Sequence, residues 1–432
     1  MEYNTIFFGD VAKIKNGYAF KSKEFQEKGI PVIKIKNIIS PIVDTKDSQK
    51  VSIKTYEKTK GFSLKKNDIL ISLTGSGVNQ MSSAVGKVGR IEFDYPALQN
   101  QRVGKFELKY SNSADLDFLF YYFLQPKITE YLVRNSTGSA NQANINSKLI
   151  ETVKIPNFSL IKQKSISKFL NQITRKIETN QKMIANLEKL SQTLFKRWFV
   201  DFEFPDEDGN PYKSSGGEMI NSELGEMPKN WKVNKLKEFT KKISSGGTPS
   251  RKVKDYWEYG EIMWLKTKEV KEKMIVTTEE NITDLGLLKS SAKIINENST
   301  VIAMYGATAG QIAYLGCKMA TNQACCTIES EYPDFIYNYF VYNANYIKTL
   351  SSGSAQQNLN KKIIEDLKLL VPSLKVLNHY ESSVNSNTSL IKSLTLSNLK
   401  LQELRDTLLP KLMSGELEIS DDIEVNTDEL SI

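Results

Sequence analysis

The sequence predicts an α+β fold: two tandem globular domains of mixed α/β structure, separated by two long antiparallel coiled-coil helices, with an internal pseudo-two-fold repeat. Short segments recur in the same chain order, each copy opens with strand-like apolar runs, and each copy ends in a long helical stretch. A period above 200 residues indicates tandem domains rather than a solenoid. The recurring segments are 14–17 with 243–246, 68–75 with 299–306, 100–101 with 322–323, 118–123 with 335–340, 138–142 with 353–357, and 193–194 with 407–408.

The globular parts are predicted at residues 1–156 and 223–372. The first contains short apolar runs at 31–35 and 69–73, which are typical of buried strands, and one aromatic helix near 115–133. Glycine and serine interrupt these runs often, which indicates many tight turns. An acidic linker, 205–222, is expected to lead into the second globular part, and an acidic tail, 416–432, ends the chain.

The long helices are predicted at 157–204 and 373–415. Apolar residues recur at alternating steps of three and four over four heptads, which is typical of a coiled-coil seam, and forty residues make a helix of about 60 Å. A proline at 156 and another at 372 precede the two helices. The expected interface residues are Ile173, Ile177, Ile184, Leu187, Leu194, Trp198, Ile391, Leu394, Leu401, Leu408 and Leu412.

Two asparagines, Asn180 and Asn398, occupy seam positions. Buried asparagines at such positions fix the register of a coiled coil, at some cost in stability. The alternative is that both side chains face water at the edge of the seam.

Composition excludes several classes of protein. No run reaches 18 apolar residues, so no membrane-spanning helix is expected, and the first ten residues lack the apolar core of a secretory signal. Three cysteines provide no disulfide framework, so a cytoplasmic location is expected. His379 is the single histidine and is expected at the surface, which argues against histidine-based triads and zinc sites.

The net charge is +8, although the last 19 residues contain seven acidic and no basic side chains. This balance favours a polyanionic partner, of which nucleic acid is the commonest. The alternative is that the lysines serve solubility alone.

The motifs that could carry catalysis are weak. Residues 85–88 lack the first glycine and the final hydroxyl of a phosphate-binding loop. Asp255 with 269–271 imitates a metal-nuclease pattern that is common by chance, and Cys325 with Cys326 is expected to pack in a core. We therefore expect no catalytic residue and no metal site.

Polar and basic residues in glycine-rich loops remain as candidates for nucleic-acid contacts. Asparagine and glutamine pair with adenine, arginine and lysine with guanine, and hydroxyl groups suit phosphates; the alternative for each loop is an ordinary turn. The candidates in the first copy are Lys34, Lys36, Thr74, Ser76, Asn79, Gln80, Asn100, Gln101, Arg102, Ser136 and Thr137. Those in the second are Ser245, Thr248, Arg251, Lys252, Lys266, Lys268, Tyr305, Thr308, Asn322 and Gln323.

Several segments resemble the specificity subunits of type I restriction-modification systems. Residues 193–203 and 404–416 are similar to the ends of that family's central and C-terminal helices. Residues 222–231, together with 245–250, 256–257 and 262–264, resemble the opening of its second target-recognition domain.

The resemblance implies a non-catalytic reader of double-stranded DNA. Each globular part would be a target-recognition domain for one half of a bipartite site. The helices would space the domains and dock two methylation subunits, and restriction subunits would complete the assembly. S-adenosylmethionine, ATP and Mg would bind to these partners, with no cofactor on this chain. The alternatives are a nuclease, a coiled-coil scaffold, or another DNA-binding protein without a restriction-modification role.

A division of labour between positions also follows. If the two domains read different half-sites, residues matched in both copies serve the scaffold or the phosphates, and unmatched residues carry the difference. Asn79 and Gln80 are therefore expected to read bases, and Lys252 to contact phosphate.

Overall fold

The structure is a computed structural model that describes residues 4–76, 85–139, 142–271, 274–352 and 359–419. The chain divides into two compact units, residues 1–176 with 401–432 and residues 177–400. Each unit holds one globular domain and one portion of each of two long helices. No helix in the described ranges is both long and apolar enough to cross a membrane.

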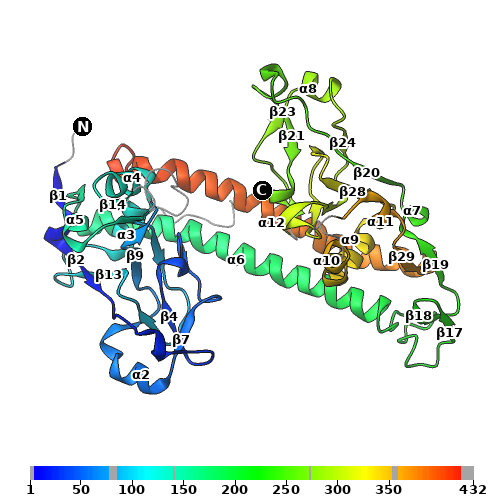
Figure 1. The fold of residues 1–432 in the computed structure, drawn as a ribbon, viewed down its shortest axis with the longest axis horizontal. Helices are drawn as coiled ribbons and strands as arrows, with labels where there is room; N and C mark the ends of the chain where they lie inside the picture. The colour runs from blue at the N-terminus through cyan, green and yellow to red at the C-terminus, as the bar shows by residue number, and fades with distance from the viewer. Residues whose placement is uncertain (1–3, 77–84, 140–141, 272–273, 353–358, 420–432) are drawn as a thin grey trace. The chain divides into compact units, whose positions relative to one another are not determined.

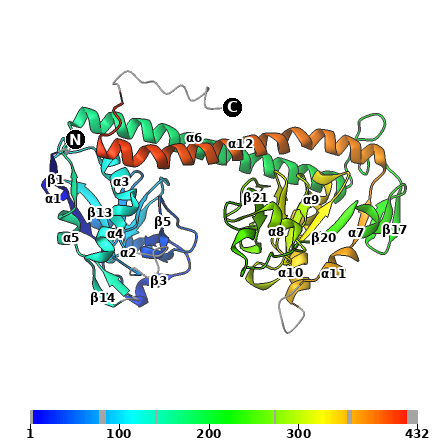
Figure 2. The ribbon, with the colours of Figure 1, turned by 90° about the horizontal axis from the view of Figure 1, so that it is seen from above.

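The two long helices are α6 (Leu160–Phe199) and α12 (Leu374–Ser414). Within each unit they pack side by side and antiparallel (Figure 1, Figure 2). In the first unit Ile166 and Leu170 of α6 share a core with Leu409 and Leu412 of α12. The predicted pairing of the helices is thus confirmed.

The predicted seam is the buried side of both helices. All eleven predicted interface residues, and Asn180 and Asn398 with them, are buried or half-buried. Asn180 and Asn398 are 1% and 8% exposed, and the Asn180 amide donates to Asn398 Oδ1 at 2.9 Å. They therefore pair with one another inside the seam rather than facing water.

The first helix ends at Phe199, short of residue 204. Phe202 has a positive φ of 59°, which turns the chain out of the helix. Phe202 and Phe204 then pack against Trp231, with ring centroids 5.5 and 5.3 Å from it. The acidic segment that follows leads into the hairpin of β17 (Met219–Ser222) and β18 (Gly225–Pro228).

The first domain is built on two larger sheets. One has the order β2-β13-β9-β11-β6-β5: Ala12–Asn16, Val103–Leu108, Ile69–Ser72, Val88–Arg90, Ile42–Val43 and Ile38–Ile39. The other has the order β3-β7-β4-β12-β8: Phe25–Gln26, Gln49–Val51, Ile30–Ile33, Ala97–Gln99 and Ser63–Leu64. The smaller sheets join β1 (Thr5–Phe7) to β16 (Lys154–Pro156), and β10 (Thr74–Gly75) to β15 (Gln142–Asn144) and β14 (Thr137–Ser139).

The second domain repeats this plan. Its sheets have the orders β20-β28-β25-β26-β22 and β23-β21-β27-β24. The strands of the first sheet are, in that order, Lys242–Ser245, Cys325–Glu329, Thr300–Ala303, Ile312–Leu315 and Met274–Ile275. Those of the second sheet are Asn281–Ile282, Ile262–Leu265, Met319–Thr321 and Ile294–Ile295. β19 (Lys232–Lys235) pairs with β29 (Lys368–Val371), as β1 pairs with β16. Because β2-β13-β9-β11 matches β20-β28-β25-β26, and β4-β12-β8 matches β21-β27-β24, in order and direction, the duplication seen in the sequence is a duplication of the fold.

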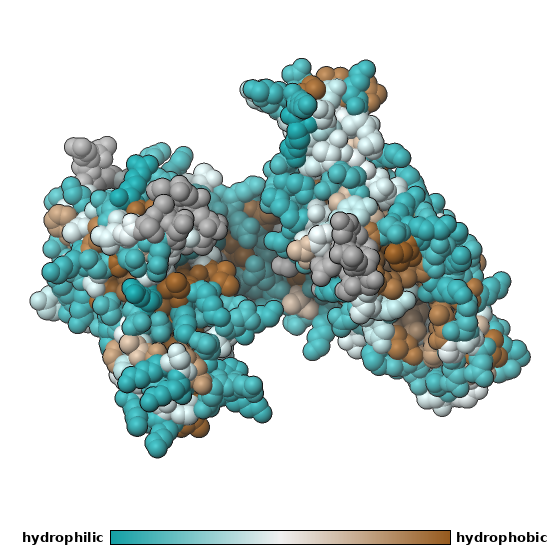
Figure 3. Space-filling model, viewed as in Figure 1, coloured by the Kyte–Doolittle hydropathy of each residue, from teal (hydrophilic) through white to brown (hydrophobic). Residues whose placement is uncertain are grey.

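Short helices complete both domains. They are α1 (Phe8–Val11), α2 (Ile53–Lys58), α3 (Leu116–Leu124), α4 (Pro126–Arg134) and α5 (Ser147–Glu151) in the first, and α7 (Leu236–Phe239), α8 (Asp284–Leu288), α9 (Pro333–Tyr342), α10 (Ala344–Ser352) and α11 (Lys361–Glu365) in the second. Hydrophilic side chains dominate the face of each domain seen in Figure 3, with hydrophobic patches between them, and Leu285 and Leu288 of α8 are exposed.

Equivalent helices attach each domain to a long helix. The single aromatic helix predicted near 115–133 is two helices, α3 and α4, because Pro126 begins the second. Helix α3 carries Asp117, whose carboxylate accepts a hydrogen bond from Asn171 of α6 at 2.7 Å. Its counterpart α9 carries Asp334, whose carboxylate accepts one from Thr388 of α12 at 2.8 Å.

Candidate nucleic-acid interface

A short turn that begins with a lysine follows the equivalent strand of each domain, and we call it the lysine turn. In the first domain Lys34 follows β4 and opens the 3-10 turn Ile35–Asn37; in the second, Lys266 follows β21 and opens Thr267–Glu269. The backbone N–H of Lys34 donates to Asn37 Oδ1, and that of Lys266 to Glu269 Oε2, both at 3.0 Å. The two turns are therefore built alike.

An asparagine turn lies beside the lysine turn in each copy, because β4 with β12, and β21 with β27, are parallel neighbours. The N–H of Asn100 donates to the carbonyl of Ile33 at 3.1 Å, and that of Asn322 to Leu265 at 2.9 Å. The side-chain oxygen of each asparagine accepts from the backbone N–H two residues on, at 3.3 and 3.1 Å. Asn100 and Asn322 thus hold the turn, which agrees with a scaffold role for matched residues.

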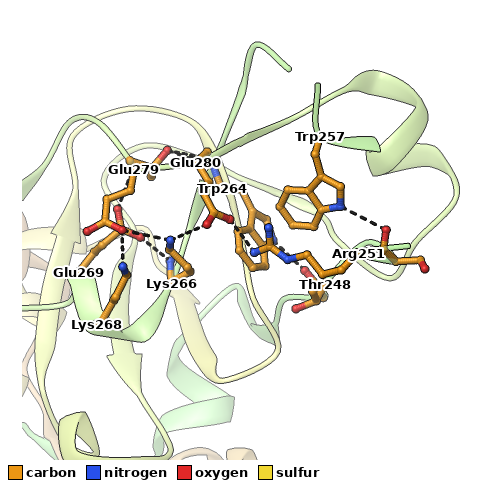
Figure 4. A network of polar contacts seen from close by, with 12 residues as sticks. Thr248, Arg251, Trp257, Trp264, Lys266, Lys268, Glu269, Glu279 and Glu280 are labelled. Carbon is orange, nitrogen blue, oxygen red and sulfur yellow. Dashed lines mark hydrogen bonds and ion pairs between the residues drawn. The ribbon is translucent and has the colours of Figure 1, made fainter. Parts of the chain in front are cut away.

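In the second domain the lysine turn lies in a network of alternating charges (Figure 4). Lys266 donates to Glu280 at 2.9 Å and to Glu279 at 3.1 Å, and Arg251 donates to the other oxygen of Glu280 at 2.5 Å. Lys268 forms an ion pair with Glu279. Three predicted DNA-binding cations, Arg251, Lys266 and Lys268, are therefore already paired with carboxylates.

The pKa values of the two paired carboxyls reflect these contacts. Burial by itself raises the pKa of Glu280, but hydrogen bonds and charge from Lys266 and Arg251 outweigh it and hold the pKa below its ordinary value. The pKa of Glu279 is lowered chiefly by its hydrogen bond from Lys268 and then by that from Lys266. Both groups are therefore ionised at neutral pH.

At the corresponding place the described part of the first domain has a glutamine instead of an acid. In the first domain, the pairing of β4 with β7 places Val32 opposite Gln49. In the second domain, Glu280 lies opposite Trp264 of β21, because the N–H of Trp264 donates to its carbonyl. Val32 and Trp264 each precede the lysine by two residues, so Gln49 occupies the place of Glu280. Lys34 donates to the neutral Gln49 and lies over the ring of Phe25, with Nζ 4.1 Å from its centroid.

Lys34 and its exposed neighbour Lys36 therefore leave the lysine turn of the first domain positively charged. Burial lowers the pKa of Lys34, and the nearby charge of Lys36 lowers it further. Two close cations, of which Lys34 has a neutral glutamine as its partner, are suited to a phosphate backbone.

The other candidates are placed differently. Thr74 is buried and donates to Asn144 at 2.9 Å, so its side chain belongs to the fold. Ser136 donates to the carbonyl of Val133 near the end of α4 at 2.7 Å, and Thr308 donates to that of Tyr305 at 3.4 Å. Ser76 and Ser245 are half-buried, Asn79 and Gln80 lie outside the described residues, and Gln101, Arg102, Thr137, Thr248, Lys252, Tyr305 and Gln323 are exposed.

Two other residues singled out from the sequence have structural roles. Both oxygens of Glu269 accept backbone N–H bonds, from Lys266 and from Glu279 at 2.8 Å, so the nuclease-like segment caps a turn. Cys325 and Cys326 are buried in β28, as expected, and His379 is exposed with its ring 5.0 Å from that of Trp198. In the described part of the chain, no three His, Cys, Asp or Glu residues gather as a metal site would require.

Sequence reasoning missed the partners of the cations. Gln49, Glu279 and Glu280 were not among the candidates, and neither were the rings of Phe25 and Trp257. The sequence signal was the adjacent pair Glu279-Glu280 after a strand-like run, but its contact with Lys266 depends on strand register.

The comparisons with known proteins agree with this architecture. The family model described as the type I restriction modification DNA specificity domain matches residues 1–189 and 228–379. The chain therefore belongs to the type I restriction-modification DNA specificity family, with one matched segment at each of its two domains, and the resemblance to specificity subunits is confirmed.

Individual relatives point the same way. The chain is 27% identical to the type I restriction enzyme MjaIX specificity subunit of Methanocaldococcus jannaschii, over 71% of this chain and 70% of that protein. It is 24% identical to the HindI specificity subunit of Haemophilus influenzae, over 70% and 77%. A solved S subunit from M. genitalium shares the fold, with a TM-score of 0.60 over 97% of both chains at 16% identity.

Proposed function

We propose that this chain is the DNA-reading subunit of a type I restriction-modification complex and supplies no catalytic group of its own. One domain reads each half of a bipartite DNA site. Family membership supports DNA recognition by both domains. The lysine turn is the observation that supports two different half-sites. Its backbone contacts are the same in both domains, but the net charge around the lysine differs.

The contacts with DNA divide by chemistry. Phosphate contacts fix the position of a protein on the duplex, whereas side chains in the major groove read the bases. The positive lysine turn of the first domain suits a phosphate. The neutralised network of the second domain holds its side chains in fixed positions, which suits a base edge.

The catalytic work falls to partners in this proposal. Two methylation subunits dock on the paired helices, and restriction subunits join in the full complex, in the cytoplasm. S-adenosylmethionine, ATP and Mg bind to those subunits. The basis is that the nuclease-like segment caps a turn through Glu269, and that Arg251, Lys266 and Lys268 are paired with carboxylates.

Methylome sequencing of cells with and without this gene tests the proposal. We expect a bipartite motif with an unread spacer to be methylated only when the gene is present together with its methylation subunit. Absence of any gene-dependent motif would refute DNA reading and favour a scaffold. The purified chain alone should show no methylation, nuclease or ATPase activity, and robust turnover by it would refute the non-catalytic role.

A further inference from the structure

Each domain places a cation on an aromatic ring at its lysine turn, but the cation comes from a different element. In the first domain it is Lys34 over Phe25. In the second it is Arg251, from the loop after β20, while the corresponding Lys266 turns to Glu279 and Glu280. Both domains thus contain a cation on an aromatic ring, but the cation differs in element and in chemistry, as expected of a residue that distinguishes two half-sites.

Arg251 is held on two sides. Its guanidinium carbon lies 3.6 Å from the ring centroid of Trp257 and 5.1 Å from that of Trp264, and its Nη2 donates to Glu280. The rings are fixed in turn, because Trp257 Nε1 donates to the carbonyl of Ser250 at 3.2 Å and Trp264 Nε1 to that of Gly247 at 2.9 Å. The Arg251 side chain is nevertheless 52% exposed.

Because the Arg251 guanidinium is ordered and still exposed, it can bind two hydrogen-bond acceptors that lie in one plane. Ordering a long side chain on binding costs free energy, and stacking together with an ion pair removes part of that cost in advance. Arginine presents a rigid fork of donors, which matches O6 and N7 of guanine.

The surrounding charge favours a base over a phosphate. Arg251, Lys266 and Lys268 are balanced by Glu269, Glu279 and Glu280, so the network is close to neutral and its carboxylates repel a phosphate. A guanine edge is uncharged and meets no such repulsion. The first domain has the reverse arrangement, with two lysines and a neutral glutamine.

We propose that Arg251 reads a guanine in the half-site of the second domain, and that Glu280, held by Lys266, is its positioning residue. The inference rests on the proposed function, since it names the side chain through which one domain recognises its bases. It assigns the first domain's Lys34 and Lys36 to phosphate contact.

The first test uses the methylated motif of cells that express each variant with the methylation subunit. Arg251→Lys keeps the charge but loses the fork, so we expect methylation to spread to sites with another base at one guanine position of one half-site. Glu280→Gln removes the charge that orients Arg251 and should relax the same position less. The matched control, Lys34→Ala with Lys36→Ala, should lower methylation at all sites alike and leave the motif unchanged.

The second test uses the assembled complex and duplexes that carry 7-deazaguanine, which lacks the N7 acceptor, at each guanine of the motif in turn. For the wild-type protein, one substitution in the half-site that Arg251→Lys relaxes should weaken binding about tenfold. With Arg251→Lys the same substitution should have little further effect. If that variant does not fold, Glu280→Gln answers the question, because it should also reduce the effect of 7-deazaguanine at that position.

The outcomes separate the two proposals. No methylated motif with the wild-type chain refutes the proposed function and this inference with it. A gene-dependent motif whose bases stay fixed in Arg251→Lys and Glu280→Gln, or uniform loss at all sites, refutes the inference alone. A motif whose two half-sites contain no guanine on either strand also refutes the inference.

Discussion

At the scale of single residues, the carboxyl pair of Asp334 and Glu381 connects the second domain to α12. Glu381 accepts the backbone N–H groups of Phe335 at 2.8 Å and Asp334 at 3.3 Å, at the start of α9. Burial raises the pKa of Glu381 to about 8, and the nearby charge of Asp334 adds to the shift. Burial likewise raises the pKa of Asp334, although hydrogen bonds from Thr388 and Tyr314 oppose it.

These shifts predict a stability that falls with rising pH. Below the ordinary pKa of a glutamate both the folded and the unfolded chain hold the Glu381 proton, so the contribution is fully present. As the pH rises toward about 8 the unfolded chain releases that proton and the folded chain keeps it, so the free energy of unfolding decreases. Glu381→Gln should flatten this part of the profile, as measured by urea unfolding of the full chain between pH 5 and 8.

A matched control is Glu403→Gln, which changes an exposed carboxyl of the same helix. It should leave the pH profile as in the wild type. If both variants keep the wild-type slope, the Glu381 carboxyl is not the group that titrates.

Some residues of the candidate site could be predicted from the sequence and others could not. The lysines and asparagines of the two turns were predictable, because turn-forming and basic residues follow apolar runs at matched places. Their partners were not, since Lys266 meets Glu280 across a strand pair whose register no local pattern specifies. Thr74 illustrates the same limit, because its contact with Asn144 joins residues 70 positions apart.

At the scale of elements, the long helices were the most predictable part of the molecule. A repeat of three and four residues defines one face of a helix whatever lies against it, so the buried side followed from spacing alone. The end of α6 could not be predicted from spacing. The chain turns away after Phe199 because Phe202 joins an aromatic cluster with Trp231, which is formed only in the folded domain.

The asparagine pair gives a prediction about the helices. Asn180→Leu leaves the buried amide of Asn398 without a partner, so we expect it to lower the free energy of unfolding by about 1–3 kcal/mol. Changing both residues to leucine should recover most of this loss, since no polar group then remains unpaired in the seam. Urea unfolding of the wild type, both single variants and the double variant measures the coupling. Additive losses in the double variant would contradict a direct pairing.

At the scale of the whole molecule, repetition made the fold class predictable while strand order was not. Recurring segments showed that the domains are duplicates, and the shared orders β2-β13-β9-β11 and β20-β28-β25-β26 bear this out. No sequence pattern placed β4 beside β12, because that parallel pairing joins strands more than sixty residues apart. Because the copies share a fold, a difference between their half-sites is expected to come from residues in which the copies differ, such as Arg251 and Glu280 in the second domain.

The length of the two long helices bears on the spacing of the DNA half-sites. Both α6 and α12 pass from one compact unit into the other, at 176–177 and at 400–401. If they set the distance between the half-sites, one extra heptad in each helix at these points adds about 10.5 Å, at 1.5 Å per residue. The seam is kept, because its pattern repeats every seven residues.

An addition of about 10.5 Å corresponds to about three base pairs of duplex. We therefore expect the methylated motif to keep both half-sites while its unread spacer grows. Three base pairs also turn the second half-site by nearly a third of a turn, which limits how far the spacer can follow. Adding three residues to each helix is the control, since it rotates the apolar face away from its partner and should abolish assembly. An active heptad variant with an unchanged spacer would show that the helices only dock partner subunits and do not measure DNA.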